Sequence, residues 1–259
     1  MIRDGVDLAR DELVLVGRVR VASNQTYVGT IGDLEVVYKP LAGEQPLWDF
    51  PDGRLAFREV ATGMISEATG WDVVPTTWFR EGPFGEGMVQ LWRPAAGGPD
   101  HRPAVDLVPS GEIPDGYLHV FDGIGYDDAP VSLIHEDSVA LRRMAIFDVV
   151  VNNADRKGGH VLEMSDGHRY GVDHGICLHH QPKLRTVLWG WAGTPLADDE
   201  LRTLRGLRAE LGGVLGDELG FWLAQIDLEA LIRRVDGLLE VGAMPVPDPG
   251  RPAIPWPPF

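Results

Sequence analysis

The chain has 259 residues, and 44% of them are apolar, which is enough for one large domain or for two lobes that share a cleft. Its formal net charge of −16 repels phosphate backbones and anionic headgroups, so we expect neither nucleic acid nor a stably bound membrane as partner. A single cysteine, Cys177, excludes an intrachain disulfide, and the lack of a long apolar run or a secretory signal predicts a cytoplasmic protein.

The first third of the chain predicts an antiparallel sheet with one helix. Residues 12–40 favour three strands, because β-branched residues recur in them and the turn sequences SNQT and GD separate the runs. Residues 55–70 fit a helix that ends at Gly70, and residues 71–79 and 87–94 are strand-like. We therefore expect a small β lobe over residues 1–93.

The remainder predicts a larger, mostly helical lobe over residues 94–241. Residues 94–116 are rich in Pro and Gly and favour a connection between lobes, whereas residues 117–134 give no clear prediction. One helix is expected from Asp137 or Ser138 to about Val151, and two or three more helices follow within 198–242. The proline-rich tail over 242–259 predicts an extended strap or a disordered end. The fold class is therefore α+β.

Two aspartates in the second half carry the chemistry. Asp155 lies in NADRKGGH, directly after the expected helix, with Arg156 beside it and His160 five residues later. Asp173 follows a short strand in YGVDHG. Phosphoryl transfer from ATP needs one aspartate that orients the acceptor and a later one that binds Mg²⁺. This spacing predicts Asp155 and Arg156 as catalytic residues, and Asp173 and His160 as ligands of Mg²⁺ or, because imidazole suits it better, Mn²⁺.

Two segments of the β lobe complete a nucleotide site. Lys39 ends the strand EVVYKP, and Glu59 follows twenty residues later on the first helix, which predicts a pair that grips phosphates. Ser23, Asn24 and Thr26 lie at the first hairpin turn, where their hydroxyl and amide groups could bind phosphate oxygens.

These segments resemble the phosphatidylinositol 3-/4-kinase-like group of atypical kinases. NADRKGGHVL with YGVDHGICLHH is similar to the catalytic and metal-binding segments of that group, and FREVATGMISEATGWDVVPTTWF is similar to its helix and following strand. GMVQLW is similar to its hinge strand. The chain as a whole resembles an actinobacterial family of PI3/PI4-kinase-like proteins, the SCO1664 type.

The resemblance implies a fold and a set of roles. It implies a two-lobed, atypical protein/lipid-kinase-like fold in which Gln90, Leu91 and Trp92 line the adenine pocket. Lys39 would bind the phosphates of ATP. His160 stands where the family pattern has Asn, so the identity of the metal ion and the turnover are open.

The sequence thus predicts an ATP-dependent phosphotransferase whose acceptor is a soluble protein or a small alcohol. A lipid headgroup is disfavoured, since a chain with a net charge of −16 and three lysines lacks the basic face that an anionic bilayer favours. Lys157, Lys183 and Arg185 could still form a local basic pocket. Three alternatives stay open: an ATP-binding regulator with little activity, a nucleotidyl transferase on the same fold, and a metal-dependent hydrolase. The hydrolase would use the histidines at positions 160, 168, 174, 179 and 180.

Overall fold

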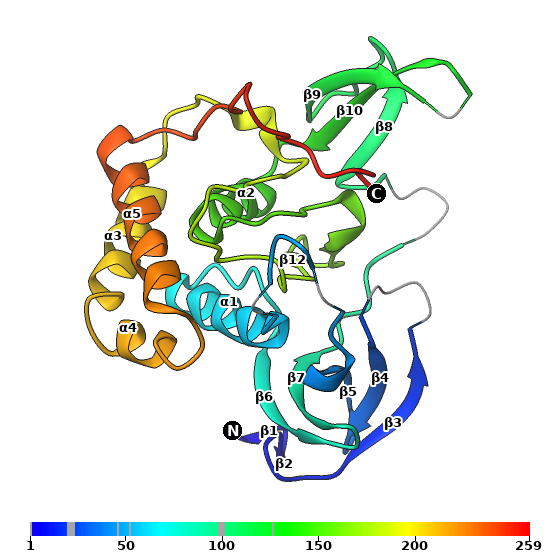
Figure 1. Ribbon diagram of the computed structural model, residues 1–259. Helices are drawn as coiled ribbons and strands as arrows, with labels where there is room; N and C mark the ends of the chain where they lie inside the picture. The colour runs from blue at the N-terminus through cyan, green and yellow to red at the C-terminus, as the bar shows by residue number, and fades with distance from the viewer. Residues whose placement is uncertain (1, 20–23, 46, 52, 98–101, 126) are drawn as a thin grey trace.

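The computed structural model describes residues 2–19, 24–45, 47–51, 53–97, 102–125 and 127–259. Over these residues the protein is α+β, as the sequence predicts. Figure 1 shows a five-stranded sheet at one end, helices beside and above it, and a three-stranded sheet at the other end. Among the described residues, no helix is both long enough and apolar enough to cross a membrane.

The five-stranded sheet is antiparallel throughout and has the strand order β3-β4-β5-β7-β6. Its strands are β3 (Leu13–Arg18), β4 (Tyr27–Ile31), β5 (Leu34–Pro40), β6 (Thr77–Gly82) and β7 (Gly85–Leu91). Val36 and Tyr38 of β5 enter a core on one face, together with Leu8, so strand alternation directs Lys39 to the opposite face. A short hairpin of β1 (Ile2–Arg3) and β2 (Val6–Asp7), which the sequence did not predict, precedes the sheet.

Helix α1 (Leu55–Thr69) covers the face of the sheet that bears Lys39, and it ends at Gly70 as predicted, with φ of 64°. Val60 packs on Met88 of the sheet, while Ile65 belongs to the main core on the other side of the helix. This double burial explains why α1 has no broad polar face. It also fixes α1 between the sheet and the remaining helices (Figure 1).

The main core lies among helices α2 (Val139–Val151), α3 (Asp198–Glu210), α4 (Val214–Leu219) and α5 (Gln225–Val241). Ser138 caps α2, as predicted, by accepting the backbone N–H of Leu141. Arg58 of α1 pairs with Asp227 of α5 at 2.9 Å, and both side chains are buried. The sheet with α1 is therefore anchored to the helices through an ion pair as well as through apolar contacts.

The segment 94–116, predicted as a connection between lobes, contains a strand that was not predicted, β8 (Val105–Pro109). This strand forms a sheet with β9 (Tyr117–Ile124) and β10 (Pro130–Glu136) in the order β8-β10-β9. A further hairpin, β11 (Val161–Glu163) with β12 (Arg169–Gly171), follows α2, and 3-10 turns occur at Leu41–Gly43, Gly158–His160 and Trp189–Trp191.

The tail after α5 is an extended strap, one of the two predicted forms. It crosses from α5 towards the three-stranded sheet (Figure 1). On the way, the carbonyl oxygen of Ala253 accepts the backbone N–H of Thr186, and that of Pro258 accepts the N–H of Gly158. The tail therefore contacts both the segment around residue 186 and the loop that contains Asp155.

Candidate active site

Lys39 and Glu59 form a buried ion pair between the sheet and α1. Lys39 shares a face of the sheet with Met88, its neighbour on β7, and Glu59 precedes Val60, which packs on Met88. The Nζ atom of Lys39 lies 2.6 Å from Oε1 of Glu59, whose side chain is only 4% exposed. Burial raises the pKa of the Glu59 carboxyl, against the attraction of the Lys39 ammonium. The other oxygen, Oε2, is buried without a hydrogen-bond partner among the described residues.

Asp173 reaches the same ammonium from the other side. It follows β12 by two residues, and its φ of 61° turns the chain sharply at this point, a conformation that Asp tolerates better than most residues. Its Oδ1 contacts Nζ of Lys39, and its side chain is 53% exposed. The Lys39 charge holds the pKa of Asp173 well below its ordinary value, against burial. Burial by itself would lower the pKa of Lys39, but the Glu59 and Asp173 carboxylates together raise it.

The loop that carries Asp155 is fixed at the end of α2. Asn152 caps the helix in the left-handed conformation, with φ of 54°. The Asn153 amide donates to Oδ1 of Asp148 at 3.0 Å, and its carbonyl oxygen accepts the backbone N–H of Asp155 at 3.0 Å. The half-buried Asp155 carboxylate lies 3.3 Å from Nζ of Lys157. The Asn152 cap and the buried Asn153 amide therefore fix the position of Asp155.

Arg156 does not contact the cavity, although it was predicted as a catalytic residue. Its guanidinium is fully buried and pairs with Asp148 at 3.0 Å. It also donates to the backbone oxygens of His160, at 3.2 Å, and Val172, at 3.3 Å. A Cβ atom on Gly171 would lie 2.7 Å from this guanidinium, so glycine is needed there. Arg156 is therefore a positioning residue that ties the Asp155 loop to the segment before Asp173.

His160 faces Asp173 with an unprotonated nitrogen. Its Nδ1 lies 2.8 Å from the backbone oxygen of Asp155, so Nδ1 carries the proton and donates it to that bond. Burial lowers the pKa of the imidazole, against the Asp173 charge. The free lone pair of Nε2 lies 3.6 Å from Oδ2 of Asp173. Two lone pairs that face each other at this distance favour a cation between them.

The charged side chains line one cavity of about 320 Å³. Lys39, Glu59, Asp155, His160 and Asp173, all predicted from the sequence, lie around it. Two further residues predicted to bind phosphate also line it, Asn24 and Thr26, whereas Ser23 lies outside the described residues. The sequence analysis did not assign the other lining residues to a nucleotide site: Gln45, Leu47, Leu55, Lys157, Gly175 and Ile176. Of these, Lys157 had a signal, since it is one of three lysines and follows Asp155 by two positions.

The three residues expected around adenine do not line this cavity. Gln90 is 5% exposed and donates to Oγ1 of Thr77 at 2.8 Å. Leu91 alternates to the opposite face of the sheet and packs in its core. Trp92 is 41% exposed, and its backbone N–H donates to the oxygen of Glu35. The side chains of Gln90 and Leu91 and the backbone N–H of Trp92 are therefore engaged within the sheet, although the resemblance to a hinge strand implied that these residues line the adenine pocket.

The cavity suits a metal ion that arrives with phosphates. Among the described residues, no three His, Cys, Asp or Glu side chains converge closely enough to hold a metal ion. Mg²⁺, however, commonly binds one or two carboxylates together with substrate phosphates and water. Asp173, with Nε2 of His160 at 3.6 Å from its Oδ2, offers such a partial donor set. The histidines do not gather as a hydrolase would require, since His168 and His180 bond to separate parts of the fold.

Comparison with known proteins finds one relative over nearly the whole chain. No family model matches the sequence. "Protein Rv2133c" of Mycobacterium tuberculosis is 49% identical over 265 residues, which cover 97% of this chain and 94% of that protein. Phosphatidylinositol 4-kinase gamma 6 of Arabidopsis thaliana is 31% identical over 104 residues, which cover 34% of this chain and 16% of that kinase. Over 34% of its length, the chain is therefore similar in sequence to a kinase.

Among solved structures, the proinflammatory kinase CtkA of Helicobacter pylori aligns with a TM-score of 0.42 and 12% sequence identity, over 92% of this chain and 94% of that one.

Proposed function

Since this chain belongs to the same family as the mycobacterial protein Rv2133c, we propose one function for the cavity that their common fold provides: ATP-dependent phosphoryl transfer by an atypical kinase. The observation that carries the proposal is the meeting of Lys39, Glu59, Asp155 and Asp173 around one cavity. They come from a strand, a helix and two loops that are far apart in sequence. The partial similarity to a phosphatidylinositol 4-kinase supports the same class of reaction.

The fold is then a two-lobed kinase fold. Residues 1–93 form the lobe of the five-stranded sheet and α1, residues 94–241 form the second lobe, and residues 242–259 form the strap. Asn24 and Thr26, at the turn between the first two long strands, lie over the phosphates from the sheet side.

Each charged residue has one task in this reaction. Lys39 binds the phosphates of ATP, and Glu59 holds the ammonium in place at 2.6 Å. A divalent cation, Mg²⁺ or Mn²⁺, supplies positive charge for the developing negative charge on the phosphates when it is bound. Asp173 and Nε2 of His160 are the residues that would hold it. Lys157 lies 3.3 Å from Asp155, where its ammonium would neutralise charge on the oxygens of the phosphoryl group that is transferred.

Asp155 orients the acceptor and takes its proton. The hydroxyl oxygen of the acceptor attacks the γ-phosphorus, and a new P–O bond forms on that side. The bond from the γ-phosphorus to the bridging oxygen breaks, and ADP leaves with the electron pair. The hydroxyl proton passes to the Asp155 carboxylate. His160 fixes this carboxylate indirectly, because its Nδ1 donates to the Asp155 backbone oxygen at 2.8 Å.

A second candidate is an ATP-binding regulator with little turnover. It is favoured by His160, an imidazole in the place where the resembling kinases have an amide. Binding experiments do not separate the two candidates, but they test the site that both share.

Nucleotide binding is tested by thermal unfolding with ATP, ADP and GTP, each with Mg²⁺, with Mn²⁺ and with EDTA. We expect ATP with a divalent cation to raise Tm of the wild type, because a ligand that binds only the folded state stabilises it. Asp173→Ala should lose this metal-dependent shift. If no nucleotide shifts Tm under any of these conditions, the proposed function is wrong.

A further inference from the structure

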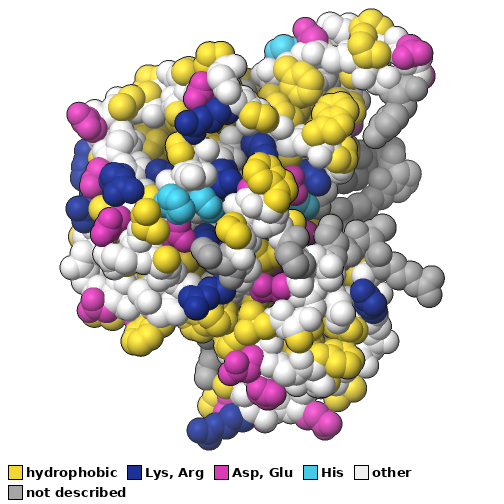
Figure 2. All heavy atoms as spheres, in the orientation of Figure 1, with side chains coloured by type: hydrophobic (Ala, Val, Ile, Leu, Met, Phe, Trp, Pro, Cys, Tyr) yellow, Lys and Arg dark blue, Asp and Glu magenta, His cyan; other side chains and the backbone are white. Residues whose placement is uncertain are grey.

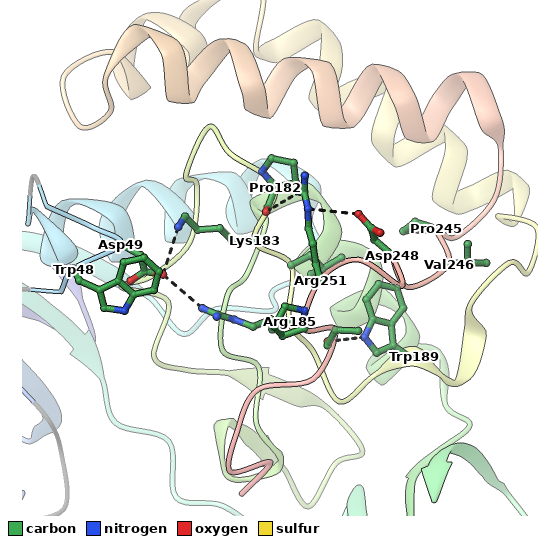
Figure 3. Close-up of a pocket in the computed structure, with 13 residues that line it drawn as sticks. Trp48, Asp49, Pro182, Lys183, Arg185, Trp189, Pro245, Val246, Asp248 and Arg251 are labelled. Carbon is green, nitrogen blue, oxygen red and sulfur yellow. Dashed lines mark hydrogen bonds and ion pairs between the residues drawn. The ribbon is translucent and has the colours of Figure 1, made fainter.

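The residues drawn in Figure 3 line a second cavity, of about 390 Å³. Its walls come from three separate segments: the loop with Trp48 and Asp49, the segment 182–189, and the strap from Pro245 to Ala253. Its size is within the range of cavities that bind small molecules. None of the residues predicted to bind ATP or a metal ion lines it.

The two cavities share a wall at the proposed catalytic aspartate. The backbone N–H of Arg185 donates to the oxygen of Asn153 at 2.9 Å, and the N–H of Arg156 donates to the oxygen of Arg185 at 3.0 Å. The Arg185 side chain also donates to the backbone oxygen of Ala154, the residue before Asp155. Leu47 lines the first cavity and Trp48 lines the second. A molecule in the second cavity therefore lies next to the Asp155 loop.

The second cavity is positively charged, although the protein as a whole is strongly acidic. Lys183, Arg185 and Arg251 line it against only two carboxylates, Asp49 and Asp248. In Figure 2, several Lys and Arg side chains also lie on the central part of this face, between the two larger sheets. With a net charge of −16 on the chain, a local excess of cations is a specific feature that favours an anionic occupant.

The cations of this cavity are incompletely neutralised. Lys183 and Arg185 both turn to the same oxygen, Oδ2 of Asp49, at 3.4 Å and 3.8 Å (Figure 3). Both distances exceed the roughly 2.7–2.9 Å of an optimal charged hydrogen bond. Arg251 lies 3.4 Å from Asp248, and both of these side chains are more than half exposed. A second anion between these groups would complete their hydrogen bonding.

The remaining walls are aromatic and apolar. Trp48 is 90% exposed, and Lys183 Nζ lies 5.9 Å from the centre of its ring. Trp189 is buried, and its indole N–H donates to the oxygen of Ala253 at 2.8 Å, which fixes the strap against the cavity. An indole that is 90% exposed suits a ring or hydrocarbon part of a bound molecule.

We propose that this second cavity binds the phosphoryl acceptor, and that the acceptor is a small organic anion that carries a hydroxyl group and an apolar part. Its carboxylate or phosphate group lies between Lys183, Arg185 and Arg251, and its apolar part packs on Trp48. Its hydroxyl group then lies at the edge of the cavity where the two cavities adjoin, between Trp48 of the second and Leu47 of the first, on the side of the Asp155 loop. The assignment rests on the proposed phosphotransferase function, which it deepens by naming the class of acceptor.

The test uses three small probes and calorimetric titration of the full chain. Mandelate carries a ring, a hydroxyl group and a carboxylate, and mandelamide is its neutral analogue. Phenyl phosphate carries a ring and a phosphate but no alcohol hydroxyl, so it probes the anion and ring contacts alone. We expect one or both anions to bind at least about tenfold more tightly than mandelamide, since a charged hydrogen bond is worth about that factor or more. Which anion binds more tightly distinguishes carboxylate from phosphate acceptors.

Variants localise the binding. Arg251→Gln should weaken anion binding about tenfold, and Trp48→Ala about fivefold, as expected for one charged contact and one aromatic contact. Asp49→Asn should instead tighten it, because the competing carboxylate is removed. Arg205→Gln and Trp256→Ala are matched controls, since both side chains are exposed and lie outside this cavity, and they should change Kd less than about twofold.

The outcomes separate this proposal from the proposed function. If wild type binds MgADP but neither anion, or binds mandelamide as tightly as mandelate and phenyl phosphate, the acceptor assignment is overturned and the nucleotide site stands. If Arg251→Gln and Asp49→Asn leave the affinity for anions unchanged, the assignment is equally overturned. If the anions bind as expected but MgADP does not bind, the cavity is no acceptor site, and the phosphotransferase function fails with it.

Discussion

Replacing Lys39 by methionine should destabilise the protein in a way that depends on pH. The variant leaves the Glu59 carboxyl buried, with 4% of its side chain exposed and without the ammonium at 2.6 Å. A buried, uncompensated carboxylate is strongly unfavourable, so we expect Glu59 to take up a proton in the folded variant. The unfolded chain keeps it ionised above its ordinary pKa of 4.5.

The magnitude follows from that difference in protonation. Keeping a carboxyl of ordinary pKa 4.5 protonated at pH 7 costs about 1.4 kcal/mol per pH unit, or about 3 kcal/mol in all. The sign is fixed because the folded variant binds one more proton than the unfolded variant above pH 4.5. Relative to wild type, the free energy of unfolding of Lys39→Met should therefore fall as pH rises from about 4.5 to 7.

The assay is urea unfolding, followed by tryptophan fluorescence, at several pH values between 5 and 7.5. The double variant Lys39→Met/Glu59→Gln removes the carboxyl and should recover most of the loss at pH 7. Asp173→Asn is the matched control, since its side chain is 53% exposed and its loss should cost at most about 1 kcal/mol. A deficit of Lys39→Met that is small, or that does not change with pH, would refute the buried pair as the structure describes it.

Three further predictions concern the same molecule. Lys39→Ala should weaken ATP affinity by roughly ten- to a hundredfold in calorimetric titration, the effect of one charged phosphate contact, and an unchanged Kd would remove Lys39 from the site. His160→Asn should raise transfer with Mg²⁺ relative to Mn²⁺, because an amide oxygen suits Mg²⁺ better than imidazole does; an unaltered ratio of the two rates would exclude His160 as a metal ligand. Burial lowers the pKa of His135, so below pH 6.5 the unfolded state binds more protons than the folded state does. The free energy of unfolding should therefore fall on acidification, by at most about 1.4 kcal/mol per pH unit from this residue. His135→Gln should flatten the plot of this free energy against pH.

Local pattern was enough to predict the sheet and helices that position the site. The strands around Lys39 carry β-branched residues and end at clear turns, and the helix with Glu59 ends at a glycine, so propensity and tertiary structure agree. The three-stranded sheet was missed because β8 and β9 bury few side chains and lie among Pro- and Gly-containing segments, whose composition favours turns.

The site was predictable where a residue's direction follows from its element. Lys39 lies on a strand, so its face is set by alternation, and Asp155 and Asp173 follow a helix and a strand at short distance. Arg156 shows the limit: its neighbour Asp155 lines the cavity, but the loop turns so tightly that the guanidinium enters the core. Sequence adjacency alone does not give the direction of a side chain in such a loop.

The second cavity could not be predicted from the sequence, for a different reason. Lys183 and Arg185 were recognised as basic residues. Trp48, however, precedes them by more than a hundred residues, and Arg251 lies on the proline-rich tail. Only the folded chain shows that the strap closes one wall of this cavity.

Transfer of a label from ATP tests the central claim most directly. The wild-type chain, with Mg²⁺ or Mn²⁺ and a mixture of small hydroxylated carboxylates and phosphate esters, is incubated in parallel with γ-labelled and α-labelled ATP. The account predicts label on an organic product from γ-labelled ATP only, and a loss of at least about a hundredfold with Asp155→Asn, whose affinity for ATP stays close to wild type. Label from the α-position would mean nucleotidyl transfer instead. Transfer that persists in Asp155→Asn would contradict the assignment of the site.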